Sequence, residues 1–358
     1  MRIFQCTTLY DGYLKRLKQL TANETSFASY RAKFISDRHG AAHFLKPILD
    51  DDALAFQANG NDDGHQKLWA KENGMRPGTS LTSILLAQIE QHRTEVFYCM
   101  DPVAYPTKFL KSLPSCVRKT IGWRAAPTGG ADLSGYDIIV SNFPELLYDY
   151  QKSGCRVAEF YPAHDPVMDR FAARADRPID VMFAGSYTRH HHDRSAMLEA
   201  VARLSDDIAV SLFLDVSPKI EAASFIPLLP SRMKISANIS KIRKEPLYGL
   251  ALYDALSKSK IVINGSIDVS KVSRGNLRCF ESMGCGSVLL TDRGTYPVGM
   301  QDGVTMFTYN EVDDALDRIR QIIADPERRK SVGQAAHSEL SERYSKDVQM
   351  RKFVELVS

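Results

Sequence analysis

Short apolar runs alternate with helix-like segments along most of this chain, and this alternation constrains the fold more than any other feature of the sequence. Strands that are buried on both faces of a parallel sheet appear as short apolar runs, and the connections between such strands are helices. The pattern therefore predicts an α/β fold, with parallel sheets that are covered by helices on both faces.

The alternation falls into two blocks, which are separated by the polar segment 172–178. In the first block, a strand at Arg2–Thr8 is expected to precede one long helical region that extends to about Gln91. An amphipathic stretch predicts a helix at Pro144–Lys152. The other strands expected in this block are Glu95–Met100, Val117–Trp123, Tyr136–Ser141 and Arg156–Tyr161.

The second block is expected to begin with a strand at Ile179–Gly185. A helix at Val312–Ala324 carries its apolar residues on one face, with Asn310 placed to cap it and Asp325-Pro326 placed to end it. The further strands expected in this block are Ile208–Leu214, Lys260–Asn264, Ser287–Thr291 and Thr305–Tyr309.

The length of 358 residues is more than a single core usually holds and suits two domains. We therefore expect two Rossmann-like domains, at residues 1–165 and 175–330, that face each other across a cleft. The remaining residues, 331–358, predict a C-terminal helix that packs back toward the first domain. Open parallel sheets bind ligands at the carboxyl ends of their strands, so two facing sheets would leave room for two substrates.

The composition excludes several classes of protein. Apolar residues make up 44% of the chain and charged residues 25%, as in soluble globular proteins, and the net charge of +3 gives no support for a nucleic-acid partner. The N-terminus reads as a strand and not as a signal peptide, and no run of about 18 apolar residues is present to span a bilayer. The six cysteines form no Cys-x-x-Cys pair, so reduced thiols and a cytoplasmic location are expected.

The segment from Ser273 to Asp292 holds the most informative pattern, which is a glycine loop, a short helix, a Gly-x-Gly turn and an apolar strand. Gly275 precedes the helix, where free backbone N–H groups and the helix dipole favour a diphosphate. Glu281 lies about one turn into the helix, where a carboxylate can accept two ribose hydroxyls. The alternative is a helix–glycine–strand unit of the kind common in α/β proteins, with a glutamate that is only solvated.

The run Phe280-Glu-Ser-Met-Gly-Cys-Gly-Ser-Val-Leu-Leu-Thr-Asp292 resembles the C-terminal signature of GT-B glycosyltransferases. Together with the preceding Arg278, it resembles the bacterial spore-maturation-type glycosyltransferase-like family. The apolar strand Ile261–Asn264, the Tyr248-Gly249 pair and the stretch that begins at Tyr344 fit the same family. The resemblance covers roughly residues 180–350, and the first 160 residues agree mainly in their pattern.

This resemblance implies an acceptor-binding N-terminal domain and a C-terminal domain that binds a UDP- or GDP-linked sugar donor. The donor diphosphate would lie on the loop Ser273–Arg278, which includes Gly275 and Asn276, and its ribose would lie on Glu281, with Tyr248 nearby. Related retaining enzymes carry a Glu-x7-Glu pattern, and Ser273 stands here in place of the first glutamate. The donor-sugar contact and the choice between inversion and retention therefore stay open.

A second phosphate-binding region is predicted where the first strand of the second block ends. Gly185 and Ser186 lie where backbone can approach a phosphate closely, and Arg189 and Arg194 follow them. Basic residues in this region of GT-B enzymes often stabilise the leaving diphosphate, and such charge stabilisation is a principal source of rate. The alternative is a solvated basic loop.

Three residues are candidates for catalysis: Asp11, Asp101 and His164. Asp11 lies in the loop after the first strand, and Asp101 follows the strand Glu95–Met100. A carboxylate at such a sheet edge can act as a general base toward an acceptor hydroxyl. His164 precedes the linker and is predicted at the floor of the cleft. Each has a structural alternative, which for Asp11 is a helix N-cap.

No metal site and no cofactor are expected. The consecutive residues His190, His191 and His192 cannot easily all face one ion, and the GT-B resemblance implies a metal-independent enzyme. The basic segment Lys234–Lys244 fits either a peripheral contact with the inner face of the membrane or a solvated loop.

These observations favour a glycosyltransferase that moves a sugar from a nucleotide-sugar donor to a carbohydrate or glycolipid acceptor, in the synthesis of a bacterial surface polysaccharide or glycoconjugate. A nucleotide-sugar epimerase of the same fold is an alternative, and it would form product without an acceptor. A non-catalytic glycan- or nucleotide-binding protein is a second alternative, which the serine at position 273 favours.

Overall fold

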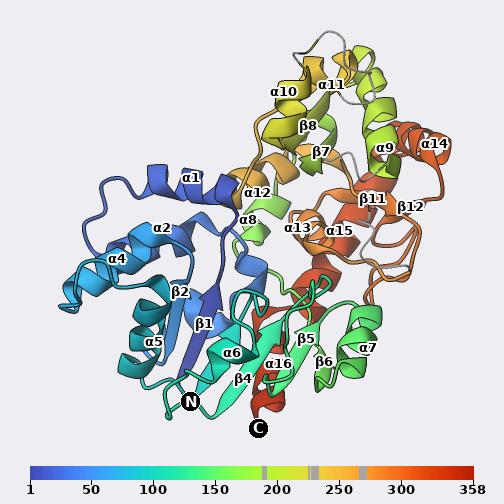
Figure 1. Ribbon diagram of the computed structural model, residues 1–358. Coiled ribbons are helices and arrows are strands. Elements are labelled where there is room, and N and C mark those ends of the chain that lie inside the picture. Colours follow the sequence, from blue (N-terminus) through green and yellow to red (C-terminus); the bar gives the residue numbers. More distant parts are fainter. Residues whose placement is uncertain (188–191, 225, 227–233, 266–271) are drawn as a thin grey trace. The chain divides into compact units, whose positions relative to one another are not determined.

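The computed structural model describes residues 1–187, 192–224, 226, 234–265 and 272–358. The chain divides into two compact units, which are described separately (Figure 1). The first unit comprises Met1–Pro162 and Lys346–Ser358, and the second comprises Ala163–Ser345. Within the described ranges, no helix combines the length and the apolar character that a bilayer crossing requires.

The first unit is built on one six-stranded sheet in the order β2-β1-β3-β4-β5-β6. Every neighbouring pair in it is parallel. Its strands are β1 (Ile3–Thr7), β2 (Ala55–Asn59), β3 (Val96–Cys99), β4 (Lys119–Trp123), β5 (Ile138–Ser141) and β6 (Val157–Glu159). Its helices are α1 (Asp11–Leu20), α2 (Phe27–Asp37), η1 (Ala41–His43), α3 (Lys46–Leu49), α4 (Asp63–Glu72), α5 (Leu81–Gln91), α6 (Thr107–Leu110), α7 (Pro144–Lys152) and α16 (Lys346–Val357).

The prediction of one continuous helical region up to Gln91 is wrong, because strand β2 interrupts it. The β2 sequence, Ala-Phe-Gln-Ala-Asn, lacks the apolar run that marks the other strands, and its polar residues are buried. The Gln57 side-chain nitrogen donates to Thr7 Oγ1 in the neighbouring strand β1 at 3.1 Å. A buried polar strand of this kind has no signal in an apolar pattern.

The second unit is built on a six-stranded parallel sheet in the order β12-β11-β10-β7-β8-β9. Its strands are β7 (Ile179–Tyr187), β8 (Val210–Val216), β9 (Arg243–Lys244), β10 (Ser259–Ile263), β11 (Val288–Asp292) and β12 (Phe307–Tyr309). Its helices are α8 (Met168–Ala172), α9 (His192–Arg203), η2 (Leu204–Asp206), α10 (Pro218–Ser224), α11 (Ala237–Ile242), α12 (Gly249–Ser257), α13 (Leu277–Gly284), α14 (Val312–Ala324) and α15 (Pro326–Arg343). The predicted fold class, α/β with two Rossmann-like domains, is confirmed.

Apolar side chains cover both faces of the second sheet. Val181 and Ile261 point to one face, where they pack with Ile319 of α14. Met182 and Val262, the next residues along the same strands, pack on the other face with residues of α12. This two-sided burial explains the continuous apolar runs in the sequence of these strands.

The C-terminal region, predicted as a single helix, forms two helices that belong to different units. Helix α15 ends at Arg343 in the second unit, and α16 begins at Lys346 in the first. The buried Lys346 ammonium group attaches α16 to the first unit by donating to the carbonyl oxygens of Ala41, Ala42 and Phe44 at 2.7, 3.0 and 2.6 Å.

The caps of α14 and α15 differ partly from the prediction. The N-cap of α14 is Glu311 and not Asn310, and the Asn310 N–H instead donates to the carboxylate of Asp314 at 2.9 Å. The predicted end of α14 at Asp325-Pro326 is confirmed, because Asp325 accepts from the Arg328 N–H at 2.9 Å and starts α15.

Candidate functional site

The candidate site lies at the carboxyl edge of the second sheet, where the neighbouring strands β7 and β10 end. Strands β8 and β9 lie on one side of β7 in the sheet, and strands β10, β11 and β12 lie on its other side. Open α/β sheets bind ligands at such a change of direction. Gly185 and Ser186 lie in the last three residues of β7, beside Leu214 and Asp215 of β8.

The loop before α13 has a fixed conformation. Gly275 has a φ angle of +109°, and a Cβ atom there would lie 2.7 Å from the ring of Pro297. The Arg274 N–H donates to the Thr295 carbonyl oxygen at 2.8 Å, and the buried Ser273 forms an isolated β-bridge with Thr295. The loop is therefore held against segment 295–297, and only glycine fits at position 275.

Asn276 begins α13 and connects it to the end of β10. Its side chain makes no capping hydrogen bond to the helix and donates instead to Asn264 Oδ1 at 3.1 Å. An anion at this helix terminus would therefore not compete with a capping side chain for the first N–H groups.

Glu281 and Arg278 form an ion pair one turn apart on α13. Arg278 Nη1 lies 2.6 Å from Glu281 Oε2, and Arg278 Nε donates to the carbonyl oxygen of Ala184 in β7 at 3.3 Å. The Glu281 residue is only 5% exposed. Burial raises the pKa of its carboxyl, and the charge of Arg278 opposes this shift. The pair therefore joins the predicted ribose ligand to the strand that carries Gly185.

Arg194, on α9, approaches the same strand from another side. Its Nη2 donates to the carbonyl oxygen of Gly265, just after β10, at 2.9 Å, and its guanidinium lies 5.8 Å from the centre of the Phe183 ring. Arg194 and Arg278 thus bring two positive charges to the end of β7. Arg189, the other predicted phosphate ligand, lies outside the described residues, as do His190 and His191, and the structure describes no side chain for His192.

Tyr248 precedes α12, and Gly249 there has a φ angle of +57°. Partial burial and the nearby carboxylate of Asp215 raise the pKa of the Tyr248 phenol. Since Asp215 pairs in register with Ser186, this tyrosine lies on the β8 side of the same sheet edge.

Asn264 is a residue of the candidate site that the sequence analysis did not single out. Its side-chain nitrogen donates to Thr291 Oγ1 at 3.2 Å. Its main-chain carbonyl oxygen accepts from the Tyr309 hydroxyl at 3.0 Å. With the bond from Asn276, these contacts join β10, β11, β12 and the start of α13. In the sequence, the feature that could have identified Asn264 is its position as a polar residue directly after the apolar run Ile261–Ile263.

Asp11 and Asp101 lie in the first unit, after the neighbouring parallel strands β1 and β3. Asp101 accepts from the Thr8 hydroxyl at 2.7 Å and lies 3.6 Å from Arg124, so its carboxylate already has two partners. Asp11 is exposed in the first turn of α1, whose N-cap is Tyr10. The two carboxylates follow strands that end at the same edge of this sheet.

His164 lies elsewhere in the second unit. It is buried, its Nε2 is 2.7 Å from Asp169 Oδ1, and its ring lies near Gly284. Gly284 ends α13, about 12 Å of helix away from the loop of Gly275. The structure thus does not bring His164 together with the residues at the start of α13.

Comparisons with known proteins agree with this description. Residues 194–355 match the model of a family described as "Glycosyl transferase-like". This match includes α13, with Arg278 and Glu281, and the strands on both sides of it. None of the curated proteins that were searched is significantly similar in sequence.

Solved structures resemble the chain over larger parts of its length. HepE from Anabaena, in complex with UDP and glucose, has a TM-score of 0.62 at 11% identity, with 100% of this chain and 99% of HepE covered. Sucrose-phosphate synthase from Thermosynechococcus elongatus has a TM-score of 0.54 at 11% identity, with 100% and 98% covered. A mutant of Staphylococcus aureus TarM, in complex with UDP, Fondaparinux and alpha-GlcNAc-glycerol, has a TM-score of 0.56 at 12% identity. In that comparison, 77% of this chain is covered, and the chain spans 59% of TarM.

These likenesses and the two parallel sheets define a protein of the GT-B fold. The matched C-terminal part is, by its family model, similar to glycosyl transferases.

Proposed function

We propose that this protein is a glycosyltransferase that moves a sugar from a nucleotide-sugar donor to a carbohydrate or glycolipid acceptor. The observation that carries the proposal is the ion pair between the partly buried Arg278 and the buried Glu281, beside the Gly275 loop at the switch point of the second sheet. This arrangement lies within the region that matches the glycosyl transferase-like family.

The donor would bind along α13. Its diphosphate would lie at the start of the helix, where Arg194 and Arg278 supply positive charge, and its ribose hydroxyls would bind to Glu281. The two guanidinium groups and the helix N-terminus would stabilise the charge that develops on the leaving diphosphate. Because these groups can take the part that a bound cation plays in other transferases, we propose that the transfer is independent of metal and needs no cofactor.

UDP is the nucleotide that we propose for the donor. The HepE and TarM structures are both complexes with UDP, and that of TarM also contains alpha-GlcNAc-glycerol. These complexes support a uridine donor and a glycan acceptor here. We place the reaction in the synthesis of a bacterial surface polysaccharide or glycoconjugate, in line with the signature of the spore-maturation-type family.

We propose the first unit as the acceptor side and Asp11 as its candidate general base. Asp11 is the better candidate because it is exposed, whereas Asp101 is held by Thr8 and Arg124. A general base must accept a proton from the acceptor hydroxyl, and a carboxylate with partners already in place is less suited to that task.

We propose a cytoplasmic location, which the burial of five of the six free cysteines supports. The contact with the inner face of the membrane has less support. Lys241 lies 2.7 Å from Asp206, and Arg243 pairs with Glu221, so two of the four cations in segment 234–244 are neutralised.

A non-catalytic nucleotide-binding protein is the second candidate, and Ser273 favours it. Ser273 occupies the place of the first glutamate of the Glu-x7-Glu pattern, is buried and is bridged to Thr295. A protein of this kind would bind the nucleotide without turning it over.

The test is an assay of UDP release from UDP-glucose and related UDP-sugars, with and without a panel of glycan acceptors. The proposal predicts release that depends on the acceptor, together with a glycosylated product in the mass spectrum. Sugar isomerisation without an acceptor would instead identify an epimerase, and UDP binding without turnover of any donor would identify the non-catalytic alternative. The variant Glu281→Ala should lose the activity, while Glu342→Ala, which changes an exposed glutamate, should keep it.

A further inference from the structure

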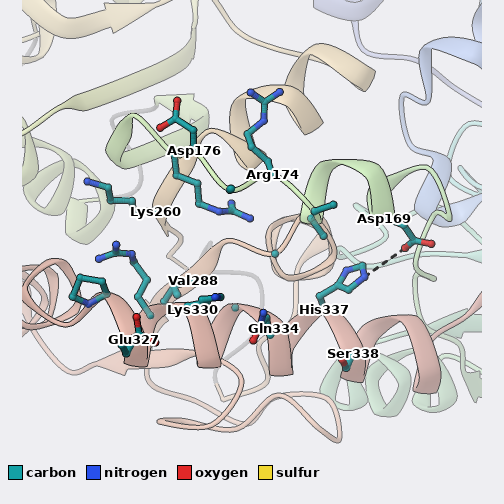
Figure 2. Close-up of a pocket in the computed structure, with 18 of the residues that line it drawn as sticks. Asp169, Arg174, Asp176, Lys260, Val288, Glu327, Lys330, Gln334, His337 and Ser338 are labelled. Carbon is teal, nitrogen blue, oxygen red and sulfur yellow. Dashed lines mark ion pairs between the residues drawn. The ribbon is translucent and has the colours of Figure 1, made fainter.

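Three side chains that are not part of the candidate donor site converge between α8 and α15. His164 Nε2 lies 2.7 Å from Asp169 Oδ1, and His337 Nε2 lies 3.6 Å from the same oxygen. One ligand atom of each residue lies within 4.8 Å of the other two. Figure 2 shows Asp169 and His337 pointing toward each other at one end of a pocket.

The orientation of His337 is fixed by the main chain. Its Nδ1 lies 2.8 Å from the carbonyl oxygen of Gly284, which can only accept, so Nδ1 carries the proton. In the neutral ring, Nε2 then presents its lone pair to the carboxylate of Asp169. A histidine that donates its other ring N–H to a carbonyl oxygen is the usual second-shell arrangement at a metal site. Two electron-rich atoms that face each other at 3.6 Å favour a cation between them.

His164 supplies a second imidazole to the cluster. It is 4% exposed, so its ring is held out of water beside Asp169. An imidazole nitrogen is a common zinc ligand.

We propose that His164, Asp169 and His337 form a binding site for a divalent transition metal of the zinc class. Two imidazole nitrogens and one carboxylate oxygen are a ligand set that suits Zn²⁺. In a tetrahedral site with ligands at about 2.0–2.2 Å, the ligand atoms are roughly 3.3 Å apart, which lies between the two distances from Asp169. The Asp169 side chain is 61% exposed, so the remaining coordination position is open to water.

The affinity of this site is expected to be modest. Coordination through Nε2 of His164 moves its ring proton to Nδ1, which is buried and has no hydrogen-bond partner among the described residues. A buried N–H without an acceptor costs about 1–3 kcal/mol, or roughly a factor of 10 to 100 in affinity. We therefore expect binding that a titration at micromolar protein concentration resolves.

The position of the site suggests what the ion does. His164 follows directly after Pro162–Ala163, where the chain enters the second unit, and Asp169 lies on the next helix, α8. His337 lies on α15, which precedes the return of the chain at Ser345–Lys346. The His164 N–H also donates to the carbonyl oxygen of Tyr344 at 2.7 Å. An ion here would fasten the entering segment to α15 within the second unit. This role is independent of the proposed sugar transfer, which uses the other end of α13.

The experiment is a titration of the full-length protein, after removal of metal with a chelator, with Zn²⁺ by calorimetry and with Co²⁺ as a spectroscopic probe. The proposal predicts one equivalent of each ion and visible Co²⁺ bands of low coordination number, without the near-ultraviolet band of a thiolate ligand. The variants His337→Ala and Asp169→Asn should each lose about 100-fold or more in affinity, since even orienting partners of metal ligands contribute 10- to 100-fold.

Two controls keep the outcome clear. A variant in which His190, His191 and His192 are all replaced by alanine should bind the ion as the wild type does, because the histidine run is not the proposed site. The circular dichroism and melting temperature of metal-free His337→Ala and Asp169→Asn report whether they fold. Zn²⁺ should raise the melting temperature of the wild type and of the histidine-run variant, but not of these two variants. The proposal is overturned if the wild type binds no stoichiometric ion, or if the histidine-run variant loses the ion while His337→Ala keeps it.

Discussion

Glu281 is the residue on which the proposed donor site depends most, and its burial destabilises the ionised form of its carboxyl. Burial raises the pKa of its carboxyl above the usual 4.5, while Arg278 favours the ionised form. The folded protein therefore takes up a proton at this position more readily than the unfolded chain does. Binding of ribose hydroxyls needs the opposite state, since a carboxylate accepts with both oxygens.

This conflict gives a pH-dependent prediction for Glu281→Gln. Because the folded-state pKa is raised, the carboxyl contributes stability below the unfolded-state value, and that contribution is lost as the pH rises through the folded-state pKa. The free energy of unfolding of the wild type, relative to the variant, should therefore fall between pH 5 and pH 8. Urea unfolding of both proteins at these two pH values measures it. A difference that is constant with pH, or that increases, would contradict the assigned environment.

Gly275 gives a second prediction at this scale. Alanine at this position would have a φ angle of +109° and a methyl group 2.7 Å from Pro297, so Gly275→Ala should cost about 2–4 kcal/mol of stability. Gly303→Ala is the matched control in the same unit: its φ is +73°, but the nearest atom is the end of the flexible Arg328 side chain at 3.6 Å, so about 1 kcal/mol is expected. Thermal unfolding compares the two, and equal losses would show that the loop is not tightly packed.

At the scale of elements, a buried lysine is one of the contacts that attach α16 to its unit, beside the buried Gln349 and Phe353. Lys346 is 3% exposed and donates to three carbonyl oxygens of segment 41–44. Lys346→Met would remove this charged donor from all three oxygens, although Ala41 and Ala42 keep bonds from the Phe44 N–H and the Gln349 side chain. We expect a loss of about 1–3 kcal/mol in the free energy of unfolding. The control is Lys352→Met on the same helix, whose side chain is 56% exposed and which should change stability by less than about 0.5 kcal/mol. Urea denaturation measures both, and a small effect of Lys346→Met would mean that α16 is held by its other contacts, such as those of Gln349 and Phe353.

Most strands could be predicted from the sequence because burial on both faces leaves a continuous apolar run. Strand β7, with Val181 and Met182 on opposite faces, is an example. Strand β2 could not be predicted in this way, because it buries the polar side chains of Gln57 and Asn59. Gln57 Nε2 donates to Thr7 Oγ1 and Asn59 Oδ1 accepts from the Thr7 hydroxyl, and these contacts are distant in the sequence. Helix boundaries that depend on distant contacts could not be predicted from the local apolar pattern either. An example is the start of α16 at Lys346, which contacts segment 41–44.

The candidate site was predictable to a similar extent. Gly275 and Glu281 could be named because a glycine loop and a carboxylate at fixed spacing leave a local signal. Arg278 was expected to bind phosphate. The structure adds that it also pairs with Glu281 and donates a hydrogen bond to β7. The grouping of His164 with Asp169 and His337 could not be predicted, since His337 is 173 positions away from His164 in the sequence.

At the scale of the whole molecule, the fold is more widely shared than the sequence. The structures of HepE and sucrose-phosphate synthase cover the whole chain at 11% identity. A parallel sheet requires only that its buried positions be apolar and of suitable size, so such positions exchange freely. The match to a family model is limited to residues 194–355, where the helix α13 and its loop carry residues with specific contacts.

The measurement that tests the central claim most directly is calorimetric titration of the full-length protein with UDP, GDP, CMP and ADP, beside the variant Glu281→Ala. Hydrogen bonds to a charged group contribute about 1.5–3 kcal/mol, so the variant should bind the preferred nucleotide roughly 10- to 100-fold more weakly. Our account predicts that UDP binds and that Glu281→Ala loses most of this affinity, while Glu342→Ala retains it. If the wild type binds no nucleotide at millimolar concentration, or if Glu281→Ala binds UDP as tightly as the wild type, the assignment of the donor site is wrong.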